Sequence, residues 1–492
     1  MASTVRMPKV ELHVHLDGAF DAGVLHRAAK ACLADGKLSE DIAAKVSECG
    51  DDVEAFTKLV SCHPEDQSLK AMIDRFVFFL TFVQGNLPII EELACAFVTR
   101  QAAQNVLYTE VRYSPHIMTS VGTYDGDAGA NASGSGDMHA QAQAVVEAVT
   151  RGLRRGCEKH PGTEITQILC FLDGKVEWID SLMQIASTGR AASAAASALP
   201  FGAQPLETCP IVGVDIAAGE DHFVPAASTT VNGVWCETGA SQSENSAKHR
   251  QALRKCREMG LGITNHAGET GIAANVSAAV SDAYGRATRI GHGSADCHGL
   301  PRIASLIREP PATATGPLIA TDCHLWPLIA SLIRYAAVAA ALELASASAA
   351  DGAPPRPAEV AAAFDSLGLK APLTFECCPT SSRSTRGWTG ATWSEHPLAQ
   401  LYRLRMVAEA SGDAASAAAL PRVTVNSDDP AVFGSSLTDE CELVATAMGL
   451  GAPALRLLAA DAVEACFLDA PGKQRLHERL QAAWKDYEAT SI

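Results

Sequence analysis

The chain has 492 residues, of which 47% are hydrophobic and 19% are charged, so it is neither a small disulfide scaffold nor a disordered chain. Its formal net charge of −17 argues against a nucleic-acid backbone or an anionic membrane as a partner. Residues 1–12 contain no apolar run of signal-peptide length, and the most apolar stretch, 328–344, is interrupted by charges. Several of the 15 cysteines lie inside apolar runs. We therefore expect a cytoplasmic protein with reduced thiols and no membrane span.

Eight short apolar or β-branched runs follow one another along the chain, and each ends in polar residues. They span residues 10–15, 106–113, 165–172, 211–216, 261–266, 289–292, 373–378 and 422–426. Segments with helical periodicity, such as 145–159, 248–259 and 276–284, separate most of them. This alternation predicts an α/β fold with a parallel sheet, and eight strands close a (β/α)8 TIM barrel. A doubly wound open sheet is the alternative, but no glycine-rich nucleotide loop follows the first run.

Four stretches lack the pattern of a core. Residues 122–137, 186–205, 224–246 and 309–362 are rich in small, polar or proline residues. We expect them to be surface insertions, some of them disordered, in one barrel domain that spans residues 1–492.

Histidines and carboxylates gather where these runs end. They are His13, His15 and Asp17 at the first run, His266 at the fifth, His292 at the sixth, and Asp428 and Asp429 after the eighth. Residues two apart on a strand share a face, so His13 and His15 point the same way. Each residue alone is more often structural, but burying all of them at one barrel mouth is costly unless a cation is bound. Three imidazoles and one carboxylate suit zinc with a position left for water, whose pKa falls to about 7.

Other catalytic signatures are missing from the sequence. It contains no HExxH helix, no PCxxC after an HxE, no GxSxG elbow and no phosphate-binding loop. Cys377 and Cys378 are adjacent and face opposite sides of a strand, which makes a poor chelate. The fourth run carries no lysine at its end, which argues against a bridging lysine and a second metal ion.

Six motifs together resemble the adenosine deaminase family. They are MPKVELHVHLDGA (7–19), EVRYSPH (110–116), NHAGE (265–269), IGHG (290–293), ECCP (376–379) and NSDDP (426–430). They occur in that family's order with roughly its spacing, and they cover most of the core but none of the four insertions.

The resemblance implies a role for each matched residue. The ligands of one zinc ion would be His13, His15, His266 and Asp428. His292 would orient or deprotonate the water, and Glu269 would deliver a proton to N1 of the purine. Asp429 would bond N7, Asp17 would bond the ribose, and His15 would also contact the substrate. Arg112 and Ser114 follow the second strand, and we expect them only to support the site through hydrogen bonds. For Asp429, a helix N-cap beside Pro430 is the alternative.

Two further features concern the substrate. Leu69, Met72, Ile73 and Phe76 form a helical apolar stripe, which the resemblance makes a lid over the substrate and which is otherwise core packing. The family usually reads DLAGDE after the fourth strand, where a glycine amide meets purine N3, whereas this chain reads DIAAGE at 215–220. Either Ala218 keeps that N–H contact, with its methyl group near the base, or Gly219 serves instead.

The resemblance implies hydrolytic deamination of adenosine and 2′-deoxyadenosine to inosine and ammonia in purine salvage, with a small purine nucleoside as the partner. A sister activity on adenine, N6-methyl-AMP or another 6-substituted purine is the alternative, although the Asp17–Gly18 pair favours a free nucleoside. A catalytically silent binding barrel would have lost a ligand or the proton donor, and none is lost. A metal-dependent esterase on the same fold would usually need the missing lysine. No protein partner can be named from the sequence.

Overall fold

The computed structural model describes residues 4–63, 66, 68–120, 137–196, 210–220, 222–223, 229–231, 234–236, 244–269, 273–292, 357–366, 372–410 and 412–490. Most of the expected insertions at 122–137 and 309–362, and the second half of that at 186–205, lie outside these residues. Residues 186–196 belong to a helix. The stretch 224–246 includes a two-stranded antiparallel pair, β5 (Thr229–Val231) and β6 (Val234–Cys236).

Eight parallel strands form the barrel and confirm the predicted fold. They are β1 (Lys9–His15), β2 (Val106–Tyr113), β3 (Glu164–Leu172), β4 (Ile211–Ala217), β7 (Gly262–Ala267), β8 (Arg289–His292), β9 (Thr374–Cys377) and β10 (Arg422–Val425), which pair in this order. The residues after β10 close the ring on β1, since Asp428 N donates to His13 O at 3.1 Å and His15 N donates to Asp428 O at 2.8 Å. Every predicted strand overlaps an observed one.

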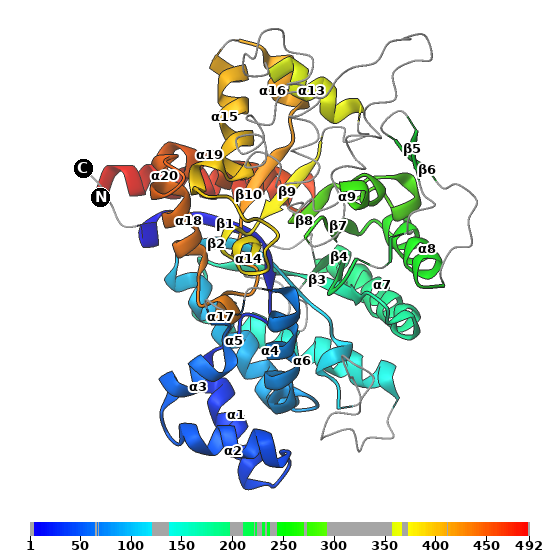
Figure 1. The fold of residues 1–492 in the computed structure, drawn as a ribbon, viewed down its shortest axis with the longest axis vertical. Coiled ribbons are helices and arrows are strands. Elements are labelled where there is room, and N and C mark those ends of the chain that lie inside the picture. Colours follow the sequence, from blue (N-terminus) through cyan, green and yellow to red (C-terminus); the bar gives the residue numbers. More distant parts are fainter. Residues whose placement is uncertain are drawn as a thin grey trace, which may run out of the picture.

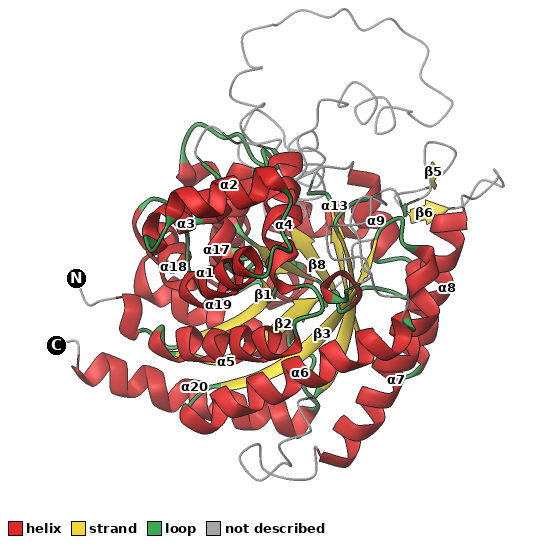
Figure 2. Ribbon diagram, turned by 90° about the horizontal axis from the view of Figure 1, so that it is seen from below, coloured by secondary structure: helices red, strands yellow, loops and turns green. Residues whose placement is uncertain are grey.

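Helices surround the strands (Figure 2). Five of them separate β1 from β2, namely α1 (Ala22–Ala34), α2 (Glu40–Cys49), α3 (Val53–Val60), α4 (Leu69–Val83) and α5 (Leu87–Ala103). Next along the chain come α6 (Met138–Lys159), α7 (Ile179–Ala196), α8 (Glu244–Glu258), α9 (Ala273–Ala279), α13 (Pro357–Ser366), α14 (Pro379–Ser384), α15 (Pro397–Ala410) and α16 (Ala414–Ala419). The last four are α17 (Pro430–Phe433), α18 (Leu437–Thr446), α19 (Gly451–Ala465) and α20 (Ala470–Thr490). The two chain ends lie near each other on one side (Figure 1).

Local sequence explains where α4 begins and which way it faces. The Ser68 side chain accepts a hydrogen bond from Ala71 N and so caps the first turn. The apolar residues of this helix then recur every three or four positions, which turns one face toward the barrel. This helix therefore lies over the carboxyl ends of the strands, where TIM barrels place their chemistry.

Among the described residues, no single helix has the length and hydropathy needed to cross a membrane. Only α4 and α5 taken together pass that test, and a bend of 120° separates them.

Candidate active site

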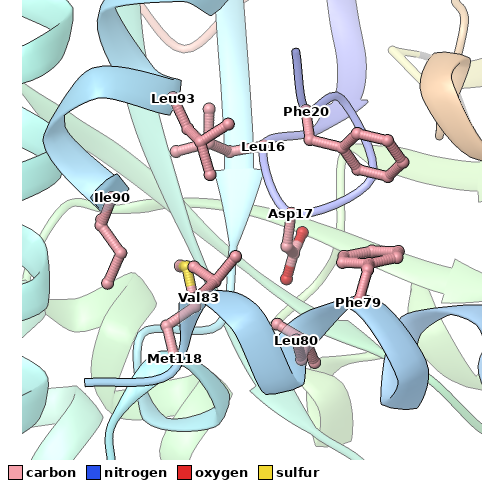
Figure 3. A pocket seen from close by; sticks show the side chains of 9 residues that line it. All are labelled: Leu16, Asp17, Phe20, Phe79, Leu80, Val83, Ile90, Leu93 and Met118. Atoms are coloured by element: carbon pink, nitrogen blue, oxygen red, sulfur yellow. The ribbon is translucent and has the colours of Figure 1, made fainter. Parts of the chain in front are cut away.

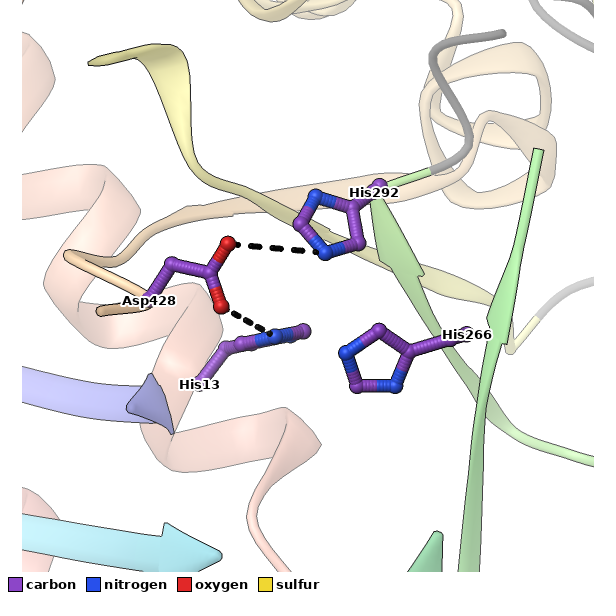
Figure 4. Close-up of side chains that lie close together, drawn as sticks. All are labelled: His13, His266, His292 and Asp428. Carbon is purple, nitrogen blue, oxygen red and sulfur yellow. Dashed lines mark ion pairs between the residues drawn. The ribbon is translucent and has the colours of Figure 1, made fainter. Parts of the chain in front are cut away.

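Five polar side chains meet at the carboxyl ends of the strands, as the sequence predicts. His13 and His15 come from β1, His266 from β7, His292 from β8, and Asp428 follows β10. Asp428 Oδ1 lies 3.2 Å from His13 Nε2, and its Oδ2 lies 3.6 Å from His292 Nε2 (Figure 4). Asp428 Oδ1 also lies 3.5 Å from His15 Nε2. The Nε2 atoms of His15 and His266 are 3.2 Å apart. All five residues are at least nine-tenths buried except His15, which is slightly more exposed.

The donor set fits a zinc ion. One ligand atom from each of His13, His266, His292 and Asp428 lies within 4.8 Å of all the others, and three imidazoles with a carboxylate are ligands that zinc accepts. His13 Nε2 is buried and has no hydrogen-bond partner in the described structure, although Asp428 lies within ion-pair distance. A buried nitrogen in this state is expected where a metal ion binds.

Distances alone do not separate His15 from His292 as the third imidazole ligand. Histidines that bind metal usually give their other nitrogen to a carboxylate. Nδ1 of His13 lies 2.8 Å from Glu376 Oε2, Nδ1 of His266 lies 2.9 Å from Asp215 Oδ2, and Nδ1 of His15 lies 3.9 Å from Asp17 Oδ1. Nδ1 of His292 has no such partner among the described residues. Since 3.9 Å exceeds a hydrogen bond, only His13 and His266 of these four histidines give their second nitrogen to a carboxylate of the described chain.

The electrostatics of these imidazoles follow from burial and from the carboxylates behind them. Burial lowers the pKa of His15 well below its usual value and that of His292 to about 3, so both rings are neutral. Burial also opposes a charge on His266, but the adjacent Asp215 carboxylate outweighs it and raises the pKa of His266 to about 9. Since a metal ligand must be deprotonated, metal binding at His266 would release a proton.

A buried ion network holds the histidines in place, and of its members the sequence analysis gave a supporting role only to Arg112. Arg112 donates to Asp215 at 2.5 Å, to Glu376 at 2.6 Å and to the Leu12 carbonyl at 2.7 Å. Arg289 donates to Glu376 at 2.5 Å and also to Glu110. One guanidinium therefore fixes both carboxylates that orient His13 and His266. A charged residue inside an apolar strand run, such as Asp215 or Glu376, is the signal that could have revealed this network.

A pocket beside the histidines encloses about 520 Å³ of atom-free space, part of it open to solvent. Its lining combines the metal-binding side with an apolar wall. The wall contains all four residues of the predicted lid, Leu69, Met72, Ile73 and Phe76, together with Ile117 and Leu172, which were not predicted. The lid assignment thus agrees with the position of α4.

Two acids that follow β7 and β10, Glu269 and Asp429, line this pocket. Burial, followed by the nearby Asp428 carboxylate, raises the pKa of Glu269 to about 8, and the same two causes raise the pKa of Asp429 well above its usual value. Glu269 Oε2 lies 3.8 Å from His292 Nε2. Both acids therefore tend to be protonated at neutral pH, which suits groups that hold a proton for a ligand.

Asp429 also occupies the N-cap position of α17, the alternative role considered from the sequence. Its side chain makes no capping hydrogen bond there, and Oδ1 has no hydrogen-bond partner within the described ranges. A side chain at position 18 would collide with it, since a Cβ on Gly18 would lie 1.8 Å from Asp429 Oδ1. The glycine thus makes room for a carboxyl group that is directed to the pocket.

The two candidates for the purine N3 contact differ in position. Ala218 lines the pocket, whereas Gly219 is not among the lining residues. A Cβ on Gly219 would lie 2.7 Å from Asp173 Oδ2, so this glycine permits close packing against Asp173. Ala218 has φ +82°, a left-handed conformation that glycine adopts far more readily. His292 and Asp428 share this feature, with φ +66° and +61°, and such strain is frequent at functional sites.

Asp17 lies between this pocket and a second, apolar cavity. It lines both, and burial raises its pKa to about 7. The other eight lining residues of the second cavity are apolar and include Phe79, Leu80 and Val83 of α4 (Figure 3). The inward face of α4 therefore extends past the lid residues and covers both cavities.

Comparisons of the sequence with known proteins identify one family. The sequence model described as "Adenosine deaminase" matches residues 8–202 and 365–483. Adenosine deaminase of Xenopus tropicalis is 24% identical over 478 residues, which are 97% of this chain and 96% of that protein.

Two solved structures share the fold. Arabidopsis ADAL in complex with IMP has a TM-score of 0.59 and 17% identity, covering 98% of this chain and 99% of that one. An amidohydrolase from Burkholderia ambifaria with bound zinc has a TM-score of 0.59 and 16% identity, covering 99% and 93%.

Proposed function

Because the chain belongs to the adenosine deaminase family, we propose that it is a zinc-dependent hydrolase that converts adenosine and 2′-deoxyadenosine to inosine or 2′-deoxyinosine and ammonia. The observation that carries this proposal is the shared pocket of Glu269 and the histidine–aspartate cluster. A proton donor for the purine and the residues that would hold a metal ion thus face the same bound molecule.

The proposed ligands are His13, His15, His266 and Asp428. A bound zinc ion would supply a water molecule that is acidic enough to react at neutral pH. His292 is neutral and is directed at both Asp428 and Glu269. It can therefore orient the attacking water and accept its proton.

Glu269 completes the reaction on the purine. As water oxygen bonds to C6, electron density moves toward N1, and the protonated carboxyl of Glu269 delivers a proton there. The C6–N bond then breaks, and the amino group leaves as ammonia with the proton that His292 took from the water. The remaining hydroxyl proton passes to the Glu269 carboxylate, which leaves a carbonyl at C6 and restores the acid. Asp429 would bond N7 and Asp17 the ribose, while the lid residues exclude water from the base.

The lining of the pocket favours a nucleoside over a nucleotide. Among the described lining residues there is no lysine or arginine that could pair with a phosphate. A 5′-phosphate carries negative charge and is bound in proteins chiefly by cationic side chains or backbone N–H groups. We therefore place AMP and N6-methyl-AMP behind adenosine as substrates.

The test is a comparison of four substrates with one enzyme preparation. Purified protein is loaded with zinc, and the ultraviolet change is followed with adenosine, adenine, AMP and N6-methyl-AMP. We expect the highest kcat/KM with adenosine. Turnover of AMP or adenine above that of adenosine would overturn the substrate assignment, and no turnover of any of the four would overturn the proposed activity.

We also propose that residues 1–492 form one barrel domain with insertions and that the protein works in the cytoplasm, in purine salvage. The eleven cysteines in the described part of the chain are free thiols, most of them buried, which fits a reducing compartment. Limited proteolysis that cuts only within 122–137, 186–205, 224–246 or 309–362 would support the single domain.

A further inference from the structure

Glu220 stands three residues after β4, outside the set of residues that the proposed mechanism uses. Its carboxylate nevertheless forms hydrogen bonds with the segment that carries Glu269, the proposed proton donor. Oε1 accepts a hydrogen bond from Glu269 N at 2.8 Å, and Oε2 accepts one from Gly268 N at 2.8 Å. Oε2 also accepts a bond from the Asn275 side chain of α9 at 2.7 Å. One side chain thus joins the ends of β4 and β7 to a helix.

The backbone is shaped to receive this carboxylate. Gly268 has φ +69°, which residues other than glycine adopt at a cost. A left-handed residue in such a turn directs successive N–H groups to the same side and forms a small concavity that binds an anion. The peptide N–H groups of Gly268 and Glu269 form this concavity, and the oxygens of Glu220 occupy it.

A strained turn after β4 precedes Glu220, whose side chain extends to the end of β7. Ala218 has φ +82°, and two residues later the Glu220 carboxylate binds the N–H groups of Gly268 and Glu269 just after β7. The backbone N–H of Glu269 is thereby fixed, and with it the direction in which its Cα–Cβ bond leaves the chain. Glu269 follows β7 in a loop and makes no strand pairing with the described residues.

The charge of Glu220 also acts on Glu269. Burial is the main cause of the raised pKa of Glu269, and the negative charges of Asp428 and Glu220 add to it, while His266 opposes it. The other titratable groups that line the same pocket are His292, whose Nε2 lies 3.8 Å from Glu269 Oε2, and Asp429, Asp17 and His15. Loss of the Glu220 charge would therefore lower the pKa of Glu269.

We propose that Glu220 is a positioning residue for proton delivery, which aims the Glu269 carboxyl at the substrate through the two backbone N–H groups that it binds. This inference rests on the proposed function. Glu220 itself touches neither substrate nor metal ion in this account.

Two variants separate the two effects of Glu220. Glu220→Gln removes the charge and places an NH2 group against one of the two N–H donors. Glu220→Asp keeps the charge but is one methylene shorter and does not span both donors. The matched control is Glu164→Gln, the same substitution at the opposite, amino-terminal end of β3, where the carboxylate accepts a bond from Arg479 at 2.9 Å.

We expect both Glu220 variants to lower kcat by about tenfold to a hundredfold with little change in KM, because small misplacements of a catalytic group have effects of this size. Zinc content and melting temperature should match those of the control. In the Gln variant alone, the alkaline limb of the pH profile should move to lower pH.

The outcomes are distinct. Wild-type kcat in both variants would overturn this inference and leave the proposed function standing. A loss of kcat that is accompanied by loss of zinc or of melting temperature would make Glu220 merely structural and would also overturn it. Wild-type protein that turns over none of the four purines would overturn the proposed function first.

Discussion

Replacement of Glu376 by glutamine tests whether the buried ion network serves the metal site. Glu376 is fully buried and accepts bonds from Arg112 at 2.6 Å, Arg289 at 2.5 Å, His13 at 2.8 Å and Thr264 at 3.2 Å. Burial opposes its charge, but Arg112 and Arg289 hold the pKa of this carboxyl well below its usual range. Glutamine has the same shape but no charge, and it places an NH2 group where only acceptors are needed.

Two magnitudes follow from these contacts. Removal of one partner from a buried ion pair costs about 3–5 kcal/mol of unfolding free energy, so the variant should be markedly less stable. Loss of the carboxylate that orients a metal-binding histidine typically weakens metal binding by about 10–100-fold, which corresponds to about 1.4–2.7 kcal/mol. The zinc effect should be visible in folded protein, below the melting temperature of the variant.

The assay is zinc affinity by competition with a chelating dye, measured beside denaturant unfolding. Glu110→Gln is the matched control, because Glu110 is equally buried and pairs with Arg289 but contacts no histidine. It should lose stability and keep zinc affinity. If zinc affinity stays within about twofold of wild type in Glu376→Gln, or falls equally in both variants, the carboxylate does not orient His13 as reasoned.

Three further predictions concern the pocket. Glu269→Gln should retain zinc and lose about 10²–10⁴-fold in kcat, which is the usual contribution of a general acid. Steady-state assays together with zinc analysis measure this, and normal turnover of the variant would contradict the assigned role. Since burial and Asp428 raise the pKa of Glu269 to about 8 and the proton is needed, kcat/KM should fall as the pH rises through 8; a profile that rises there would refute the assignment. Ala218→Gly should stabilise the fold by up to about 1.5 kcal/mol, which is the ~1–2 kcal/mol of left-handed strain less the ~0.5–1 kcal/mol entropy cost of glycine. Denaturant unfolding measures this change, and a clear loss of stability would contradict the strain.

The barrel and the residues at its mouth could be predicted because they depend on local patterns. Apolar runs that alternate with helical segments specify parallel strands, and eight strands specify closure. Polar residues at the carboxyl ends of the strands then lie at the same mouth of the barrel, independently of the conformation of the loops. His266 and His292 were predicted on this basis, and Figure 4 places both beside Asp428.

The supporting contacts could not be predicted because they depend on register and on loops. Arg112 meets Asp215 and Glu376 only because their strands bring inward-facing positions to the same level of the barrel, and a one-residue slip would turn each side chain outward. Glu220 binds backbone N–H groups 48 and 49 residues further along the chain. A pattern of side chains in the sequence does not predict a contact with a distant backbone group. The choice between Ala218 and Gly219 required φ values, which the sequence does not contain.

Six buried acids lie around the metal-binding histidines and the pocket, and their surroundings favour the anionic form in three of them and the neutral form in the other three. The pKa values of Asp215, Glu376 and Asp428 are lowered, whereas those of Asp17, Glu269 and Asp429 are raised. All six are buried, so burial alone does not distinguish them. The first three contact guanidinium or imidazole groups at 2.5–3.2 Å, while Asp17 and Glu269 lie 3.9 and 3.8 Å from an imidazole and, with Asp429, line a pocket that has an apolar wall. Acids whose pKa values are shifted in opposite directions take different roles, because an anionic carboxylate can bind a cation and a neutral carboxyl can donate a proton. A mutation that brought a guanidinium beside Glu269 should therefore abolish turnover without disturbing the metal ligands.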